Sequence, residues 1–151
     1  MDGSSGDGDG GLCDALPLEA ALALDGEGSR IAQARHLAVA FLGKVKDCLG
    51  IPVATATVEI VQLIVSELVT NARKYAPGPA LLQLRVVAGP VLQVELWDSN
   101  PVAPVAKALD PRRIGQHGLE IVTALARTVT VEQTPVGKRI IAAVPLDGAA
   151  A

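Results

Sequence analysis

Residues 67–78 read ELVTNARKYAPG, and this stretch decides how the rest of the chain is interpreted. It closes a segment, about 54–75, whose apolar residues recur at the three- and four-residue steps of an amphipathic helix. The apolar stripe of that helix consists of Val58, Val61, Ile64, Val65, Leu68, Val69 and Ala72. Glu67, Asn71 and Lys74 stand at i, i+4 and i+7, so they project from one face. Such a row suits a polar site, and it equally suits a solvated face with a Glu–Lys pair.

The hydrophobic pattern on either side of this helix predicts the remaining elements. In chain order they are a strand at 16–24, a helix at 29–49, the helix at 54–75, strands at 81–87 and 91–97, a helix opened by Gly118, and strands at 128–133 and 139–144. This order predicts an α+β fold, a two-layer sandwich of a mixed, mostly antiparallel sheet with helices on one face. Residues 98–116 show little periodicity, and long irregular segments in compact domains are usually functional.

Composition bounds the function. The chain has 151 residues, half of them hydrophobic, which gives one domain with a proper core. Its net charge of −3 and aromatic share of 2% argue against a nucleic-acid binder, which needs clustered basic or stacking side chains. The most apolar stretch, Val58 to Val69, is interrupted by polar residues, so no membrane span is expected.

The ends of the chain and its cysteines predict where the protein is found. Residues 1–11 are rich in Gly and Asp, which predicts a disordered leader and no signal peptide. We assign 12–147 to the folded domain and 148–151 to a tail. Cys13 and Cys48 lack the spacing of a metal site and make a poor disulfide framework. A reduced, cytoplasmic protein is therefore expected.

Four blocks of this sequence, in the expected order, resemble the ATP-binding motifs of the gyrase/histidine-kinase superfamily, the Bergerat fold. They are ELVTNARKYAPG (67–78) for the N-box, WDSNPVAP (97–104) for the G1 box, GQHGLEIV (115–122) for the G2 box, and GKRIIAAVPL (137–146) for the closing strand. The resemblance covers the whole predicted domain. Within the superfamily the chain is most similar to the stand-alone anti-sigma-factor serine/threonine kinases of actinobacteria.

The resemblance implies a role for each residue of the N-box row. Glu67 would be the general base that accepts the proton of a serine hydroxyl. Asn71 would coordinate Mg²⁺, since an amide oxygen suits a hard cation. Lys74 would offer a point charge to the phosphates, and Tyr75 would lie against the base or sugar. Asp98, which otherwise reads as a turn former, would accept a hydrogen bond from the adenine amine.

The resemblance also implies contacts from the loop and from the last strands. The remaining nucleotide-binding residues are Arg112 and Arg113 in a lid at 99–116, Gly115, His117, Gly118 and Leu119 in the G2 box, and Lys138 in the closing strand. The two glycines would let backbone N–H groups approach the phosphates. The two arginines equally suit a solvated loop.

The function implied is transfer of the ATP γ-phosphate to a serine of an anti-sigma antagonist, combined with sequestration of a sigma factor. Neither nucleic acid nor membrane is an expected partner, and a homodimer is possible. The chain departs from the family pattern at three places. The G1 box has no glycine after Asp98, Gln116 stands in the G2 box where a second glycine is common, and Lys138 stands in the closing strand where the family has a threonine. These departures motivate an alternative, a catalytically weak or inactive module that binds nucleotide and sequesters a partner. A detached sensor-kinase domain is a third possibility.

Overall fold

The computed structural model describes residues 18–24, 30–75, 78–99 and 119–146. Its elements are β1 (Leu18–Leu24), α2 (Arg30–Leu49), α3 (Thr55–Tyr75), β2 (Ala80–Val87), β3 (Val91–Asp98), α6 (Glu120–Leu125), β4 (Thr128–Thr134) and β5 (Gly137–Pro145). The predicted leader at 1–11 and tail at 148–151 lie outside the described residues. Every predicted strand and helix is present, with ends that differ by a few residues.

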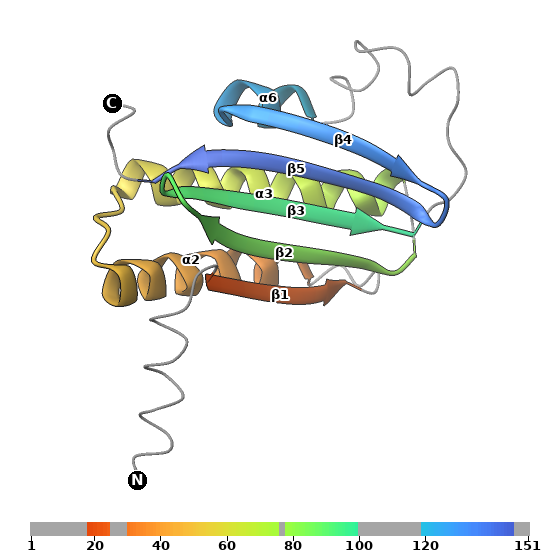
Figure 1. Ribbon diagram of the computed structural model, residues 1–151. Helices are drawn as coiled ribbons and strands as arrows, with labels where there is room; N and C mark the ends of the chain where they lie inside the picture. Colours follow the sequence, from red (N-terminus) through yellow and green to blue (C-terminus); the bar gives the residue numbers. More distant parts are fainter. Residues whose placement is uncertain (1–17, 25–29, 76–77, 100–118, 147–151) are drawn as a thin grey trace, which may run out of the picture.

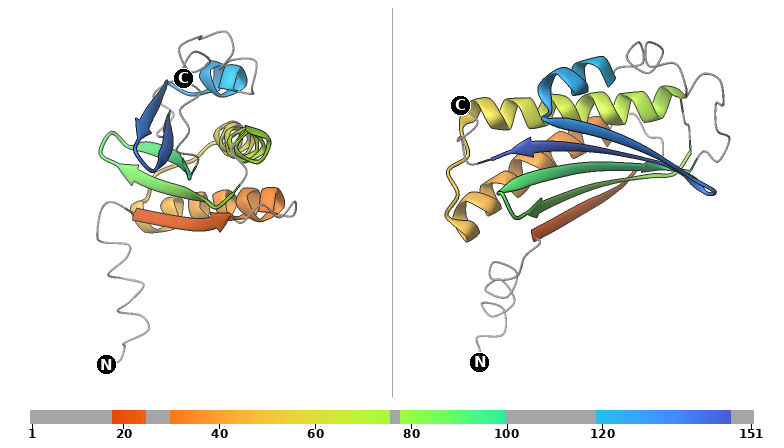
Figure 2. Two further views of the ribbon diagram at one scale, coloured as in Figure 1. Left: turned by 90° about the vertical axis from the view of Figure 1, so that its right-hand side faces the viewer. Right: turned by 45° about the horizontal axis from the view of Figure 1, so that its top comes forward.

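The strands form one sheet in the order β1-β2-β3-β5-β4. The predicted α+β fold is confirmed, and all four pairings of the described strands are antiparallel. Two of the pairs, β2 with β3 and β4 with β5, are hairpins. A short turn joins the two strands of each pair, and such turns connect only antiparallel neighbours. The predicted layers are confirmed: α2, α3 and α6 lie on one face of the sheet (Figures 1 and 2).

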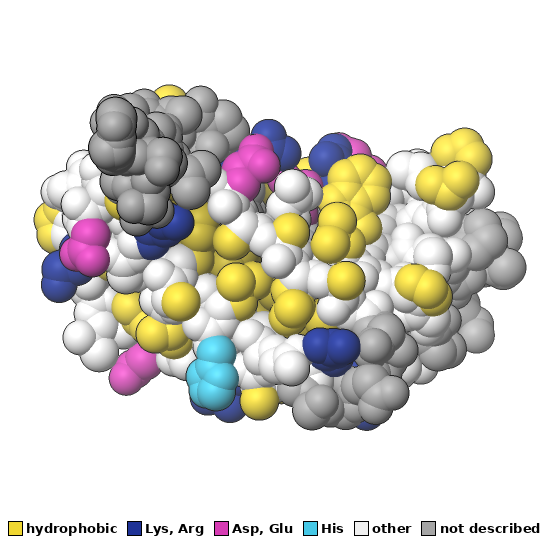
Figure 3. Space-filling view, turned by 90° about the horizontal axis from the view of Figure 1, so that it is seen from below, with side chains coloured by type: hydrophobic (Ala, Val, Ile, Leu, Met, Phe, Trp, Pro, Cys, Tyr) yellow, Lys and Arg dark blue, Asp and Glu magenta, His cyan; other side chains and the backbone are white. Residues whose placement is uncertain are grey.

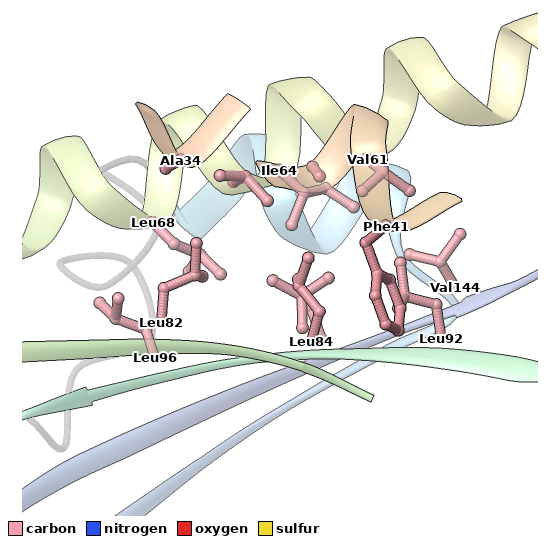
Figure 4. Packing of buried hydrophobic residues seen from close by; sticks show 14 of the residues in the cluster. Ala34, Phe41, Val61, Ile64, Leu68, Leu82, Leu84, Leu92, Leu96 and Val144 are labelled. Atoms are coloured by element: carbon pink, nitrogen blue, oxygen red, sulfur yellow. The ribbon is translucent and has the colours of Figure 1, made fainter. Parts of the chain in front are cut away.

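The core lies between the helices and one face of the sheet. Register places Leu82 opposite Leu96, and Leu96 opposite Ile140, so the three central strands present aligned apolar side chains to the helices. From the helical layer Phe41, on α2, and Ile64, on α3, point toward the sheet (Figure 4). Fully burying one such side chain contributes about 1.5–3 kcal/mol. The α3 stripe predicted from sequence is confirmed, since six of its residues are buried and Val58 packs against the core.

Two helix ends show what stops each helix, the end of α2 before α3 and the end of α6 before β4. The N–H of Gly50 donates to the carbonyl of Lys46 at 3.0 Å, and the φ of +66° at Gly50 is one that glycine adopts without strain. α6 is shorter than the nine-residue run LEIVTALAR suggests. Its end is set by Arg127, whose N–H donates to the carbonyl of Ala143 on β5 at 2.8 Å. The chain has therefore joined the sheet before the helical pattern of the sequence runs out.

One expectation about the cysteines is wrong. Cys48, on α2, is disulfide-bonded, whereas the sequence predicted reduced thiols. The other cysteine of the chain, Cys13, lies outside the described residues. Spacing along the chain does not reveal which thiols a fold brings within bonding distance, and this is why the pattern misled.

The side of the molecule formed by α2 and β1 is seen in Figure 3. Hydrophobic side chains occupy the middle of this face, and most charged side chains lie toward its rim. β1 is an edge strand of the sheet. Among the described residues, no helix combines the length and the apolar character needed to cross a membrane.

Candidate functional site

The polar row predicted on the second helix lies in the C-terminal half of α3. Glu67, Asn71 and Lys74 all belong to α3, so their spacing places them on one face, as predicted. Glu67 is half-buried, Asn71 is buried and Lys74 is exposed, so the middle residue of the row is the least accessible to solvent. The end of α3 lies at the same end of the molecule as the end of β3 and the start of β5 (Figure 1).

Asn71 is the most informative member of this row. It is 6% exposed, and its Oδ1 atom is buried without a hydrogen-bond partner in the described part of the chain. Leaving a buried polar atom unpaired costs about 1–3 kcal/mol, so folded proteins rarely keep one without a use. An amide oxygen held in this way is suited to accept a hydrogen bond or to ligate a hard cation.

Asp98 and Lys138 form a second polar group at the same end of the molecule. Asp98 ends β3 and is paired in register with Lys138 on β5. The Lys138 Nζ lies 3.5 Å from the Asp98 Oδ2, and the two side chains are 21% and 3% exposed. Side chains alternate along a strand, so both residues share the sheet face of Leu96 and Ile140, which is the face that the helices cover.

Two backbone features fix the position of Asp98. A Cβ atom on Gly137 would stand 1.9 Å from the Asp98 carbonyl oxygen, so only glycine allows β5 to begin so close to the end of β3. The Ser99 hydroxyl donates to the carbonyl of Pro79 at 2.8 Å. This bond connects the end of β3 to the segment that follows α3.

The other predicted site residues are placed as follows. Tyr75 is the last residue of α3. Leu119 immediately precedes α6 and is 5% exposed within the core, so its side chain serves packing. The remaining predictions, for Arg112, Arg113, Gly115, His117 and Gly118, fall outside the described residues.

Sequence reasoning missed a row of charges on the face of the sheet opposite the helices. Glu95, on β3, is 1% exposed and lies between Arg85 at 3.3 Å and Arg139 at 3.6 Å. Arg85 also pairs with Glu19 at 3.7 Å, and Arg139 pairs with Glu132, so charges of alternating sign cross all five strands. The single signal in the sequence was a glutamate within the apolar run VLQVELW.

The profile of a family described as "Histidine kinase-like ATPase domain" matches residues 28–144, which include all the described site residues. This chain belongs to the histidine kinase-like ATPase domain family. Membership implies ATP binding and agrees with the resemblance drawn from the four sequence blocks. No protein of curated function shows significant sequence similarity to the chain.

One solved structure supports the fold of this histidine kinase-like ATPase domain. The chain is similar to a crystal structure of the RsbU and RsbW domains of Rv1364c from Mycobacterium tuberculosis, with 15% identity and a TM-score of 0.62. That match covers 85% of this chain and 32% of the other, so the chain spans about a third of that protein's length. A histidine kinase domain from Erythrobacter litoralis EL346 shows 23% identity over 59% of this chain and 44% of its own, with a TM-score of 0.44.

The residues present fit the ligands that the family implies. Mg²⁺ commonly keeps several waters and takes substrate phosphate oxygens, so the unpaired amide oxygen of Asn71 is a suitable protein ligand. Asp98 is a buried carboxylate, which can accept hydrogen bonds and cannot donate them when ionised. A buried carboxylate and a buried amide oxygen, which would suit a base and a cation, therefore lie at one end of this molecule.

Proposed function

We propose that this protein binds ATP and Mg²⁺ and transfers the γ-phosphate to a serine or threonine hydroxyl of a protein partner, as a regulator of the anti-sigma kinase type. The observation that carries the proposal is the buried Oδ1 of Asn71, which has no hydrogen-bond partner in the described part of the chain and stands in a helical row with Glu67 and Lys74. An apolar side chain would fill that position without the energetic cost. The unpaired oxygen is therefore explained by a ligand that the protein is built to bind.

The chemistry assigned to the chain's own residues is proton transfer and positioning. Glu67 is half-buried and one helical turn before Asn71, so its carboxylate can accept the proton of an incoming hydroxyl. The hydroxyl oxygen forms a bond to the γ-phosphorus while the bond from that phosphorus to its bridging oxygen breaks, and ADP leaves. Lys74, exposed at the end of the row, offers a positive charge to the phosphates. Asn71 would hold Mg²⁺, which neutralises charge on the phosphates.

The partners we propose are a sigma factor and an antagonist protein that carries the phosphorylated serine or threonine. The similarity in fold to a structure containing an RsbW domain supports this class of partner. The cytoplasm is the compartment that this function requires, because ATP is available there. A homodimer is the proposed assembly, and β1, an edge strand beside a largely apolar face, offers a surface for it (Figure 3).

Replacing Glu67 separates phosphotransfer from nucleotide binding. We expect Glu67→Gln to lose phosphotransfer from labelled ATP to a candidate antagonist while its ATP affinity stays within about threefold of the wild type, since the carboxylate acts on the hydroxyl. Glu59→Gln, at an exposed position of the same helix, is the matched control and should keep both properties. Unchanged phosphotransfer in Glu67→Gln would refute its role. ATP binding without any phosphoprotein in the wild type would favour the inactive, partner-sequestering module.

A further inference from the structure

In the proposed site, Asp98 is the carboxylate that would bind the base, and it forms an ion pair with Lys138. Lys138 stands opposite Asp98 in the sheet register, and its ammonium lies 3.5 Å from the Asp98 carboxylate. The Asp98 side chain is 3% exposed, so this charge pair lies in a largely dehydrated setting, where it is stronger than on the surface. The inference drawn from this pair rests on the proposed nucleotide site.

A carboxylate by itself distinguishes adenine from guanine, because it can only accept hydrogen bonds. Adenine presents an amine at the position where guanine presents a carbonyl oxygen. The amine donates to the carboxylate, whereas the carbonyl oxygen faces it as a second acceptor. Two buried acceptors left facing each other are costly, so a site of this kind rejects guanine. The rejection depends on the absence of a donor beside the carboxylate.

Lys138 places such a donor there. An ammonium has three N–H donors and no acceptor, and its flexible stem lets it turn toward a new acceptor without moving the strand. At 21% exposure the side chain keeps some room to do so. The neighbouring cation, Arg139, belongs to the opposite face of the sheet, where it pairs with Glu132 and stacks 4.9 Å from the Trp97 ring. Lys138 therefore serves the face on which a base would be bound.

We propose that Lys138 is a specificity-determining residue that makes the site accept guanine as well as adenine nucleotides. The ammonium donates to the guanine carbonyl oxygen, and Asp98 accepts from the adjacent ring N–H. With adenine, Asp98 accepts from the amine and Lys138 remains its counter-ion. The site thus offers the base both a hydrogen-bond acceptor, Asp98, and a hydrogen-bond donor, Lys138. The repulsive contact that excludes guanine is removed, which is how specificity is commonly lost.

Calorimetric titration with ATP and with GTP, both in Mg²⁺, tests this on the full chain. The wild type should bind the two nucleotides with Kd values within about tenfold of each other. Lys138→Met removes the charge and keeps an unbranched stem, and it should weaken GTP relative to ATP by a further 10- to 100-fold, roughly the effect of one unpaired buried group. Lys138→Arg, which keeps a charged donor, should retain the wild-type ratio. Lys44→Met, at an exposed position of α2, is the matched control for loss of a lysine.

The outcomes separate this inference from the proposed function. Tight ATP binding with the same ATP-to-GTP ratio in the wild type and Lys138→Met would overturn the role of Lys138 alone. Binding of neither nucleotide to any variant would overturn the nucleotide site and this inference with it. If Lys138→Met does not fold, as judged by thermal melting, Lys138→Gln supplies a neutral side chain that can still form hydrogen bonds. Its ratio should lie between those of the wild type and a strict adenine site.

Discussion

Asn71→Leu should make the protein more stable while it weakens nucleotide binding. The Oδ1 of Asn71 is buried and unpaired in the described part of the chain, and the residue is 6% exposed. Removing an unpaired buried polar atom recovers about 1–3 kcal/mol. Leucine is close to asparagine in shape and gains up to about 0.5 kcal/mol in helix propensity, whereas its extra volume costs about 1 kcal/mol.

The net expectation is a gain of about 0.5–2.5 kcal/mol in the free energy of unfolding. For a chain of this size each kcal/mol raises the melting temperature by about 2–4 °C. Thermal unfolding without nucleotide measures the gain, and titration with ATP in Mg²⁺ measures the loss of affinity. Thr70→Leu on the same helix is the matched control, since it brings a similar gain in helix propensity at a half-buried position without removing an orphan oxygen.

Opposite changes in stability and affinity would mark Asn71 as a residue kept for a ligand. A polar residue that is retained for packing or folding gives a different result. If Asn71→Leu lowers the melting temperature and leaves ATP affinity unchanged, Asn71 has an internal structural role. The reasoning that assigns Asn71 to Mg²⁺ is then refuted, whatever else the protein binds.

Two further predictions concern the sheet. Gly137→Ala places a Cβ against the backbone of Asp98, which cannot yield as a flexible side chain can; it should cost about 1–3 kcal/mol, as overpacking does, and lower ATP affinity by displacing Asp98. An unchanged melting temperature would contradict this account of the close approach. Glu95→Gln leaves Arg85 and Arg139 facing each other across β3 and should lower stability by about 1–3 kcal/mol in chemical denaturation. ATP affinity should stay the same, because Glu95 lies on the sheet face opposite the helices and Asp98.

The parts of the fold that the sequence predicted are those fixed by local pattern. The apolar period of α3 located Glu67 and Asn71 on one face, and the hairpin of β2 and β3 located the strand that Asp98 ends. These features depend on neighbouring residues in the chain, where periodicity is informative. The same holds for the assignment of helices to one layer.

The contacts that join distant strands could not be predicted in this way. The pairing of Asp98 with Lys138 depends on β3 and β5 becoming neighbours, with α6 and β4 between them in the sequence. The burial of Glu95 has the same origin, because its arginine partners come from strands on either side. The sequence predicted a longer α6, but the hydrogen bond from the Arg127 N–H to the carbonyl of Ala143 in the sheet ends the helix earlier. Tertiary context decided each of these cases.

The measurement that tests the central claim most directly is calorimetric titration of the wild type and Asp98→Asn with ATP, with and without Mg²⁺. Asp47→Asn, at an exposed position of α2, is the matched control. The account predicts Mg²⁺-dependent binding in the wild type and the control, and its loss in Asp98→Asn, because Asp98 is the buried acceptor at the end of β3. Equal affinity in Asp98→Asn, or no heat in the wild type up to about a millimolar, a binding free energy of about −4 kcal/mol, would contradict the claim that this end of the molecule is a nucleotide site.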